Sequence, residues 1–474
     1  MGKHITRHLF WGTEKRSPGP YGEFYEAAAL PADSENPYLD VYKAPRERAA
    51  YLLRIASEVE HALMAQYLFA AWSLGNPDLS PEQLDLARSW RTTILDIARE
   101  EMGHLATVQN LLTLIGAPQS FARDDYPSPS HIYPFRFELE PLTKVSLGKY
   151  VLSEMPSDEK LEALERKHKI EKGEIKAIRQ FVRRSGYRGA ATVHRVGKLY
   201  DAIASLFTSP EVFTELITTP PAAGPQKLKQ YIATQDINAD AVAFMVKPGE
   251  WKLGYEGLLI FAPADRTGAL KAIEQISAQG EGSGLDDFDS SHFGRFLKIY
   301  RVFPDVSSWL PARLVARNPT TNAGNPGASQ IRDGVAIRWA KLFNLRYRML
   351  LMFLVHSFAV ETPVSQSART SRGLLISWAF GEMYHLRSIG EILMGLKIAE
   401  GSEEFAGPPF EMPYALELAP REPDRWRLHR DLILSSQRYV EELLLVKTGF
   451  ETYLRGLKSA DAVALEQAIA MVGA

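Results

Sequence analysis

Two long segments, residues 45–74 and 80–115, carry apolar side chains at helical spacing and are separated by only a short connection. Pro45 fits the first turn of the first helix. Ser80 and Gln83 form the capping-box pattern that begins the second helix. Two long amphipathic helices joined by a short loop predict an antiparallel pair, which is half of a four-helix bundle.

The second helix places two ionisable residues, Glu101 and His104, in its apolar stripe, where leucine or isoleucine would be expected. A buried carboxylate and a buried imidazole are costly unless something pairs them. The i, i+3 spacing directs both side chains to one point, and a metal ion is the usual partner of Glu-x-x-His on a bundle helix. A buried pair satisfied by hydrogen bonds is the alternative. Glu60 lies in the apolar stripe of the first helix, so a second helix also presents a carboxylate to the core.

Further candidate ligands follow along the chain. Glu154 ends a short helix of about residues 147–155, and Glu281 lies between two glycines at the end of a helix that begins at Thr267. His292 begins the next helix, so Glu281 and His292 flank a single loop and can meet. Carboxylates combined with imidazoles suit iron, in a mononuclear or dinuclear site, or manganese. The predicted metal ligands are Glu60, Glu101, His104, Glu154, Glu281 and His292.

Composition excludes several other kinds of site. The 474 residues include no cysteine, so disulfides, thiolate metal sites and iron–sulfur clusters are ruled out. The formal net charge is -2, which does not favour nucleic acid or an anionic membrane as a partner. The first residues lack the apolar core of a signal peptide, and no apolar run is long enough to span a bilayer. We therefore expect a cytoplasmic protein.

The remaining segments suggest how the chain is divided. Short inserted helices are expected within the charged residues 157–186, a small β-hairpin is considered at 241–262, and one long helix is predicted over 424–456. The predicted units are an irregular N-terminal arm (1–44), a metal-binding helical domain (45–304), a linker rich in proline, glycine and asparagine (305–329) and a C-terminal helical block (330–474).

A second Glu-x-x-His pair, Glu382 and His385, lies on a helix of the C-terminal block. This pair could form a second metal site or complete the bundle, so the motif alone does not decide between the two helices. Nearby arginines could pair with an anionic substrate, but surface ion pairs are the preferred interpretation. They are Arg332, Arg338, Arg346 and Arg348.

The segments Glu60-His61-Ala62-Leu63-Met64-Ala65-Gln66-Tyr67-Leu68 and Glu100-Glu101-Met102-Gly103-His104-Leu105 resemble the ferritin-like domain of the iminophenyl-pyruvate dimer synthase family. This family includes the ferritin-like portions of violacein, rebeccamycin and staurosporine pathway enzymes. Three later segments support the resemblance, which covers roughly residues 46 to 430. They are Gln279-Gly280-Glu281-Gly282, Ser291-His292-Phe293-Gly294-Arg295-Phe296 and Ala406-Gly407-Pro408-Pro409-Phe410-Glu411.

The resemblance implies a ferritin-like bundle with a non-haem iron site and, in the pathway enzymes, oxidative coupling of amino-acid-derived imines. Those enzymes are much longer and also involve haem, so this chain is similar to their ferritin-like part alone. We expect an iron oxidoreductase of specialised metabolism that uses dioxygen or peroxide on a small substrate, with an amino-acid derivative as one candidate. The alternatives are iron oxidation with peroxide protection, or a non-catalytic scaffold. No nucleic-acid or membrane partner is expected, and a homo-oligomer is left open.

Overall fold

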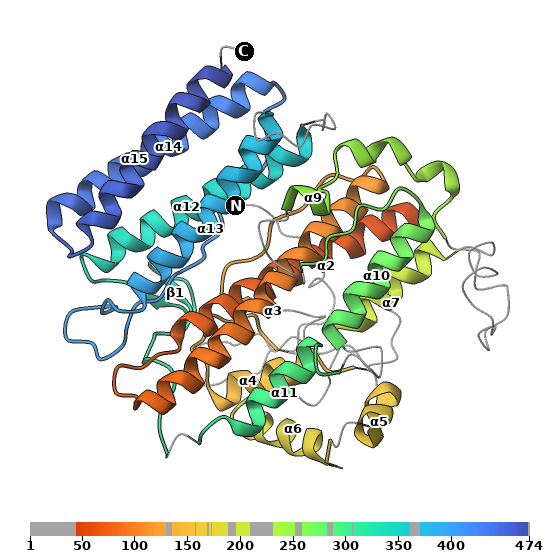
Figure 1. The fold of residues 1–474 in the computed structure, drawn as a ribbon, viewed down its shortest axis with the longest axis horizontal. Coiled ribbons are helices and arrows are strands. Elements are labelled where there is room, and N and C mark those ends of the chain that lie inside the picture. Colours follow the sequence, from red (N-terminus) through yellow and green to blue (C-terminus); the bar gives the residue numbers. More distant parts are fainter. Residues whose placement is uncertain are drawn as a thin grey trace.

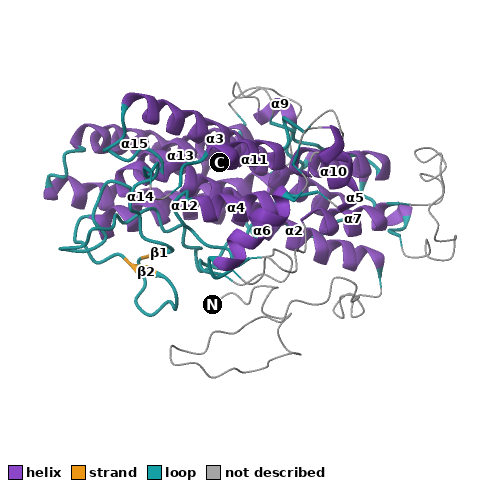
Figure 2. Ribbon diagram, turned by 90° about the horizontal axis from the view of Figure 1, so that it is seen from below, coloured by secondary structure: helices purple, strands orange, loops and turns teal. Residues whose placement is uncertain are grey.

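The computed structural model describes residues 44–128, 135–156, 158–167, 170–171, 173–187, 196–208, 231–251, 258–281, 288–305, 308–360 and 370–472. The predicted mainly α-helical fold is confirmed, because helices account for nearly all regular structure in these ranges (Figure 2). The predicted N-terminal arm, residues 1–44, lies outside the described residues except for Ala44.

The two long helices predicted at the start of the chain are present as α2 (Pro45–Ser73) and α3 (Pro81–Leu114), which pack along one another (Figure 1). The capping box at the start of α3 forms as expected. The Ser80 side chain accepts a hydrogen bond from Gln83 N, and the Gln83 side chain accepts one from Ser80 N. This pair is the continuous half of the bundle.

The other half of the bundle consists of two broken helical columns. In the first, α4 (Lys144–Ser153) is followed, after an insertion, by α7 (Val196–Phe207). In the second, α10 (Arg266–Glu281) is followed by α11 (His292–Val302). The helix α7 packs against α10 and α2, whereas α4 packs against α11, so each column has one piece near either end of the α2–α3 pair (Figure 1). Both columns are therefore interrupted beside the middle of the pair.

The insertion contains two short helices, as predicted, α5 (Asp158–Lys167) and α6 (Glu174–Arg184). The apolar edge of α6 packs on α4 at Gly148, where an added Cβ would lie 2.8 Å from Val182 Cγ2. A glycine at this position is what allows the two helices to approach so closely.

The small β element is not located where the sequence suggested it. The described residues of 241–262 form part of a 3-10 helix, η4 (Ala239–Ala243), a helical turn, α9 (Pro248–Trp251), and loop. A two-stranded sheet is found instead between β1 (Pro319–Thr320) and β2 (Ser329–Gln330), and its strands are parallel. Four apolar residues of this segment are nevertheless buried in the core: Met245, Val246, Trp251 and Ile260.

The C-terminal part contains α12 (Ala336–Ala359), α13 (Ser371–Leu393), α14 (Glu422–Val446) and α15 (Glu451–Val472), which lie together on one side of the α2–α3 pair (Figure 1). The prediction of one helix over 424–456 is wrong. Lys447 and Gly449 adopt positive φ values of 51° and 84°, and the chain reverses there into α15. The helical periodicity continues across the turn, so the pattern alone could not reveal the break.

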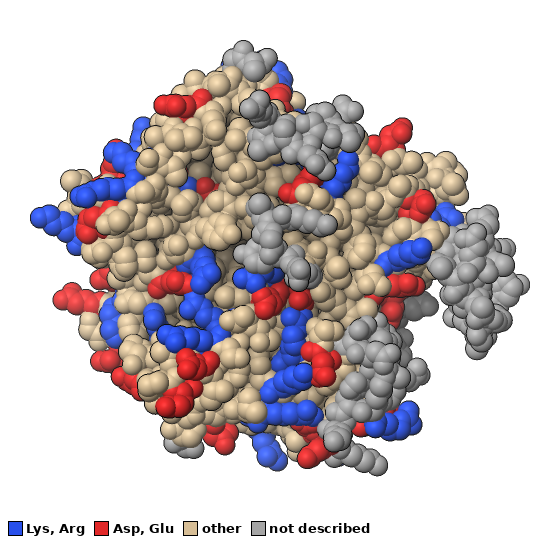
Figure 3. All heavy atoms as spheres, viewed as in Figure 1, with Lys and Arg blue, Asp and Glu red and all other residues tan. Residues whose placement is uncertain are grey.

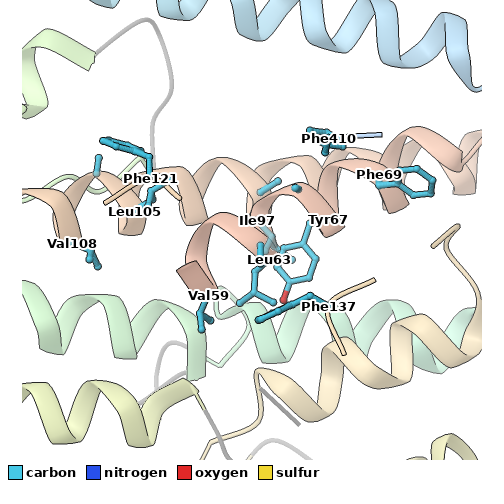
Figure 4. Packing of buried hydrophobic residues seen from close by; sticks show 14 of the residues in the cluster. Val59, Leu63, Tyr67, Phe69, Ile97, Leu105, Val108, Phe121, Phe137 and Phe410 are labelled. Atoms are coloured by element: carbon cyan, nitrogen blue, oxygen red, sulfur yellow. The ribbon is translucent and has the colours of Figure 1, made fainter. Parts of the chain in front are cut away.

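One continuous apolar core joins α2 to the C-terminal helices. Phe410 stacks on Trp72 with ring centroids 5.8 Å apart, and an added Cβ at Gly407 would lie 2.9 Å from the Phe69 ring. Figure 4 shows Phe410 and Phe69 near α2, and Leu63 and Tyr67 among the packed residues. The segment 406–411, singled out from the sequence, is thus a packing wedge between the two halves of the molecule.

On the face shown in Figure 3, basic and acidic side chains are interspersed among neutral ones. Among the described helices, none combines the length and apolarity that crossing a lipid bilayer requires.

Candidate metal centre

Two groups of buried ligand-type side chains meet where the bundle columns are interrupted. The first comprises Glu60 of α2 with Glu101 and His104 of α3. His104 Nδ1 lies 2.9 Å from Glu101 Oε2 and 3.4 Å from Glu60 Oε2. The ligand atoms of the group all lie within 4.8 Å of one another, which is close enough for one metal ion to contact all three.

The second group comprises Glu101, Glu154 and His292, and its ligand atoms likewise lie within 4.8 Å of one another. His292 Nδ1 lies 3.1 Å from Glu101 Oε1 and 3.6 Å from Glu154 Oε2. The two groups therefore share Glu101, which directs one carboxylate oxygen to each histidine. Glu101 is therefore the one side chain that belongs to both of these groups.

Local sequence explains how α4 and α11 deliver their ligands. Ser291 caps α11 by accepting a hydrogen bond from Gly294 N, which makes His292 the first helical residue. A Cβ at Gly294 would lie only 1.9 Å from the Phe288 carbonyl oxygen, so only glycine allows this tight entry into the helix. Glu154 is the C-terminal cap residue of α4, directly before Met155-Pro156. Both ligands are thus placed by helix ends.

The two carboxylates that belong to only one group each, Glu60 and Glu154, are called the terminal carboxylates. Each accepts a hydrogen bond from a buried tyrosine. Tyr200 of α7 donates to Glu60 Oε1, and Tyr67 of α2 donates to Glu154 Oε1, each over 2.5 Å. Burial and the neighbouring Glu60 raise the pKa of Tyr200 well above its usual value, so its hydroxyl keeps the proton it donates. In both carboxylates the Oε2 atom faces the histidine of its group.

The outer nitrogens of the two histidines have different partners. His104 Nε2 lies 3.0 Å from Gln279 Oε1 at the end of α10. His292 Nε2 lies 2.9 Å from Glu100 Oε2, and Glu100 is also paired with Arg295. In both cases an oxygen acceptor fixes the outer nitrogen as the protonated one and leaves Nδ1 to face the site. The hydrogen position follows from the acceptor, as is usual for histidine.

Without metal, these groups have strongly shifted pKa values. Burial, followed by the nearby Glu101, raises the pKa of Glu60 to about 8. Burial opposes protonation of His104, but Glu101 and Glu60 outweigh it and raise the pKa of His104 to about 10. The pKa of His292 is raised well above its usual value, and that of Glu101 is lowered well below its own, although burial acts in the opposite direction on both. The cluster thus demands compensating positive charge.

The donor set fits metal ions. Within the described part of the chain, three buried atoms that face the site form no well-directed hydrogen bond, although each lies within 3.4 Å of a histidine or carboxylate of the cluster: Glu60 Oε2, Glu101 Oε1 and His292 Nδ1. Buried polar atoms are rarely left unsatisfied, so such a concentration calls for a missing partner. Carboxylate oxygens and imidazole nitrogens suit iron or manganese.

The structure brings five of the six predicted ligands together: Glu60, Glu101, His104, Glu154 and His292. The sixth, Glu281, is the last residue of α10, and its side chain lies outside the described part of the structure. Its neighbour Gly280 borders the site, since an added Cβ there would lie 3.5 Å from Glu154 Oε2. Glu281 therefore stays a prediction.

The second Glu-x-x-His pair has a different environment. Glu382 Oε1 accepts a hydrogen bond from Arg346 Nη1 at 2.7 Å, and Arg346 also pairs with Asp461. His385 Nδ1 lies 3.3 Å from the Tyr453 hydroxyl. Among the described residues, neither Glu382 nor His385 belongs to a group of three metal-binding side chains. Arg346, expected in a surface ion pair, is instead only 1% exposed.

The sequence indicated no role at the site for Tyr200, Gln279 or Glu100, and it left two roles open for Tyr67. A redox or hydrogen-bonding role beside Glu60 was one interpretation of Tyr67, and packing was the preferred one. Its ring does pack on Tyr150 and Phe296, and its hydroxyl also donates to Glu154. Its position seven residues after Glu60 places it on the same face of α2, which was an available signal. Glu100 directly precedes Glu101, and Gln279 lies two residues before Glu281. The sequence pattern did not indicate that either residue would contact a candidate ligand.

Comparisons with known proteins agree with this architecture. A family model described as ferritin-like matches residues 53–301. The chain is 27% identical over 406 residues to dichlorochromopyrrolate synthase of Lentzea aerocolonigenes, covering 78% of this chain and 36% of that protein. It is also 27% identical over 398 residues to 2-imino-3-(indol-3-yl)propanoate dimerase of Chromobacterium violaceum, covering 76% of this chain and 33% of that protein. The chain thus spans about a third of the length of these relatives, as their coverage of 36% and 33% shows.

Among solved structures, a ferritin-like protein from Caulobacter vibrioides aligns with 74% of this chain and 97% of its own, at 16% identity and a TM-score of 0.39. That score is too low to support an argument. The two synthases are relatives of the kind that the sequence motifs indicated, so the predicted resemblance is confirmed. Since the family model covers more than half of the chain and includes α3, α4, α7, α10 and most of α2 and α11, the chain belongs to the ferritin-like family.

Proposed function

We propose that the chain is a non-haem iron oxidoreductase with a dinuclear centre. The observation that carries this proposal is the shared carboxylate of Glu101, which contacts two matched groups of ligands. Glu60 and His104 would hold one ion, Glu154 and His292 the other, and Glu101 would contact both. Glu281 is proposed as an additional ligand.

Iron bound in such a carboxylate-rich site would supply redox chemistry with dioxygen or peroxide as the oxidant. The side chains of the five ligands are at most 5% exposed, so the site excludes bulk water. Tyr200 and Tyr67 hold protons on their hydroxyls and fix the orientation of the terminal carboxylates. The protein thus provides a dry and rigid binding site.

The relatives suggest where to look for the substrate. One acts, by its name, on 2-imino-3-(indol-3-yl)propanoate, which it dimerises. We propose that this chain also oxidises a small amino-acid-derived molecule. If the reaction is a coupling, two substrate molecules each lose one hydrogen as the new bond forms, and one peroxide takes up both electrons and both protons to give two waters.

Metal analysis tests the centre itself. Apoprotein loaded with Fe²⁺ under anaerobic conditions should hold two ions per chain, and Glu101→Ala/His104→Ala should hold none or one. The matched control is Glu382→Ala/His385→Ala, which removes the second Glu-x-x-His pair and should keep both ions. Full metal content in the first variant would disprove the assignment, and loss only in the control would identify the rival pair as the site.

Oxidation of the loaded protein distinguishes an oxidoreductase from an iron-storing protein. An oxidoreductase should take up oxidant in amounts that follow added substrate, with the imine named above as the first test compound. An iron-storing protein should instead oxidise many Fe²⁺ per chain without organic substrate. Continued iron oxidation well beyond two ions per chain would therefore favour the alternative function.

A further inference from the structure

The two proposed metal positions are matched in almost every respect. Each has one histidine Nδ1, one oxygen of Glu101 and one terminal glutamate whose outer oxygen accepts a tyrosine hydroxyl at 2.5 Å. Any difference between the positions must therefore come from what lies behind these ligands. The partners of the histidine outer nitrogens are where the structure departs from symmetry.

Behind His292 lies a carboxylate, and behind His104 lies an amide. Glu100 Oε2 is 2.9 Å from His292 Nε2, whereas Gln279 Oε1 is 3.0 Å from His104 Nε2. Arg295 binds the same Glu100 carboxylate through both of its terminal nitrogens and so fixes its orientation. Glu100 has only 14% of its side chain exposed, so solvent screens it little.

A carboxylate polarises the imidazole more strongly than a neutral amide does, because it carries a negative charge and accepts a stronger hydrogen bond. The imidazole then becomes a better electron donor to a metal at its other nitrogen. Removing such an outer partner typically costs 10- to 100-fold in metal affinity. Glu100 belongs to neither group of candidate ligands and contacts the outer nitrogen of His292, so it acts through His292 as a positioning residue.

We propose that the two metal positions are inequivalent, and that the Glu100–Arg295 pair makes the position at His292 the tighter of the two. The metal ions then load in a fixed order, first at His292 with Glu154 and then at His104 with Glu60. A centre loaded in this order can hold one ion while the other is exchanged. This inference rests on the dinuclear centre proposed above.

Titration of the metal-free protein with Co²⁺, an oxygen-stable substitute for Fe²⁺, tests the order of loading. Wild-type protein should bind two ions in two resolved steps whose dissociation constants differ about 10-fold or more. His104→Ala should keep the tight step and lose the weak one, and His292→Ala should do the reverse. Loss of the tight step in His104→Ala would overturn the proposed order.

Two further variants test the cause. Glu100→Gln, which preserves the side-chain size, should weaken the tight step about 10-fold or more and bring the two steps together. Gln279→Glu should strengthen binding in the weak step, so that its dissociation constant approaches that of the tight step. Asp96→Asn is the control, since it removes a carboxylate on α3 that pairs with Arg99 near the surface, and it should change neither step.

The possible failures are distinct. Wild-type protein that binds no Co²⁺ would disprove the metal centre, and with it the proposed function. Two ions bound with equal constants would disprove only the inequivalence. Constants in Glu100→Gln and Gln279→Glu that match those of Asp96→Asn would show that the histidine partners do not control affinity. Thermal unfolding of each variant, measured without metal, separates these results from loss of the fold.

Discussion

Replacing Arg346 by methionine should destabilise the protein strongly without affecting the metal centre. The guanidinium is buried between α12, α13 and α15, with Glu382 Oε1 at 2.7 Å and Asp461 Oδ1 at 2.5 Å. Removing it leaves two carboxylates in the core without a cation. Breaking a buried ion pair from one side typically costs about 3–5 kcal/mol.

The size of the effect follows from the proton that the variant must bind. Asp461 keeps its hydrogen bond from Ser436 at 2.8 Å, so Glu382 is the carboxylate that the loss of Arg346 destabilises more in its charged form. Neutralising a glutamate whose ordinary pKa is 4.5 costs about 3.4 kcal/mol at pH 7, at about 1.36 kcal/mol per pH unit. At pH 5.5 the same step costs about 1.4 kcal/mol. The free energy of unfolding of the variant should therefore be about 2 kcal/mol larger at pH 5.5 than at pH 7.

The sign follows from linkage. Burial already raises the pKa of Glu382 to about 7 in the native protein, despite the opposing effect of Arg346. Without Arg346 the pKa must rise further, so the folded variant keeps a proton that the unfolded chain releases above the ordinary glutamate pKa of 4.5. The folded state then binds more protons than the unfolded state, and stability falls as the pH rises.

Urea unfolding at both pH values, followed by far-UV circular dichroism, measures the change in the free energy of unfolding. Arg338→Met is the matched control on the same helix, because Arg338 is partly exposed and donates to the Gly334 carbonyl one turn earlier in the chain. It should change stability by at most about 0.5 kcal/mol. A loss below about 1 kcal/mol at pH 7 in Arg346→Met, or a variant whose own stability does not rise from pH 7 to pH 5.5, would refute the reasoning.

Three further predictions concern the metal centre. Tyr200→Phe removes the donor to Glu60 Oε1, so it should weaken metal binding about 10-fold or more in a Co²⁺ titration. Tyr439→Phe, on α14, is the control and should leave the dissociation constants unchanged. Equal constants in the two variants would contradict the role of Tyr200. Burial and Glu101 raise the pKa of Glu60, and Glu101 and Glu60 raise the pKa of His104 against the effect of burial. A metal ion must therefore displace protons, so the apparent metal affinity should rise as the pH increases from about 6 to about 8. An affinity independent of pH would count against this. Gly103→Ala would place a Cβ 2.5 Å from the Leu259 carbonyl oxygen beside His104, so we expect the free energy of unfolding to fall by about 1–3 kcal/mol. Unchanged stability would show that residues 258–259 can move to accommodate the added methyl group.

Some of this architecture was readable from the sequence because it is written in local patterns. The periodicity of residues 45–74 and 80–115 predicted α2 and α3, and the Ser80–Gln83 capping box located the start of α3 within one residue. Polar residues in an apolar stripe identified Glu60, Glu101 and His104 as candidates for one site. These signals are local, since a helix requires only that nearby residues repeat on one face.

Other features could be known only from the tertiary structure. Tyr200, Gln279 and Glu100 lie on three different helices. Each contacts a candidate ligand that is far away in the chain, Glu60, His104 and His292 respectively. The break between α14 and α15 depends on two residues with positive φ inside a continuing apolar pattern.

The two Glu-x-x-His pairs show the division most clearly. Glu101–His104 and Glu382–His385 have the same spacing on similar amphipathic helices, so the motif by itself did not distinguish them, and the preference for the first pair came from the other candidate ligands and the family resemblance. Tertiary packing placed Glu60, Glu154 and His292 around the first pair, and Arg346 beside Glu382 of the second. The physical reason is that a buried carboxylate takes whichever positive partner the fold brings to it, and that partner comes from a distant part of the chain.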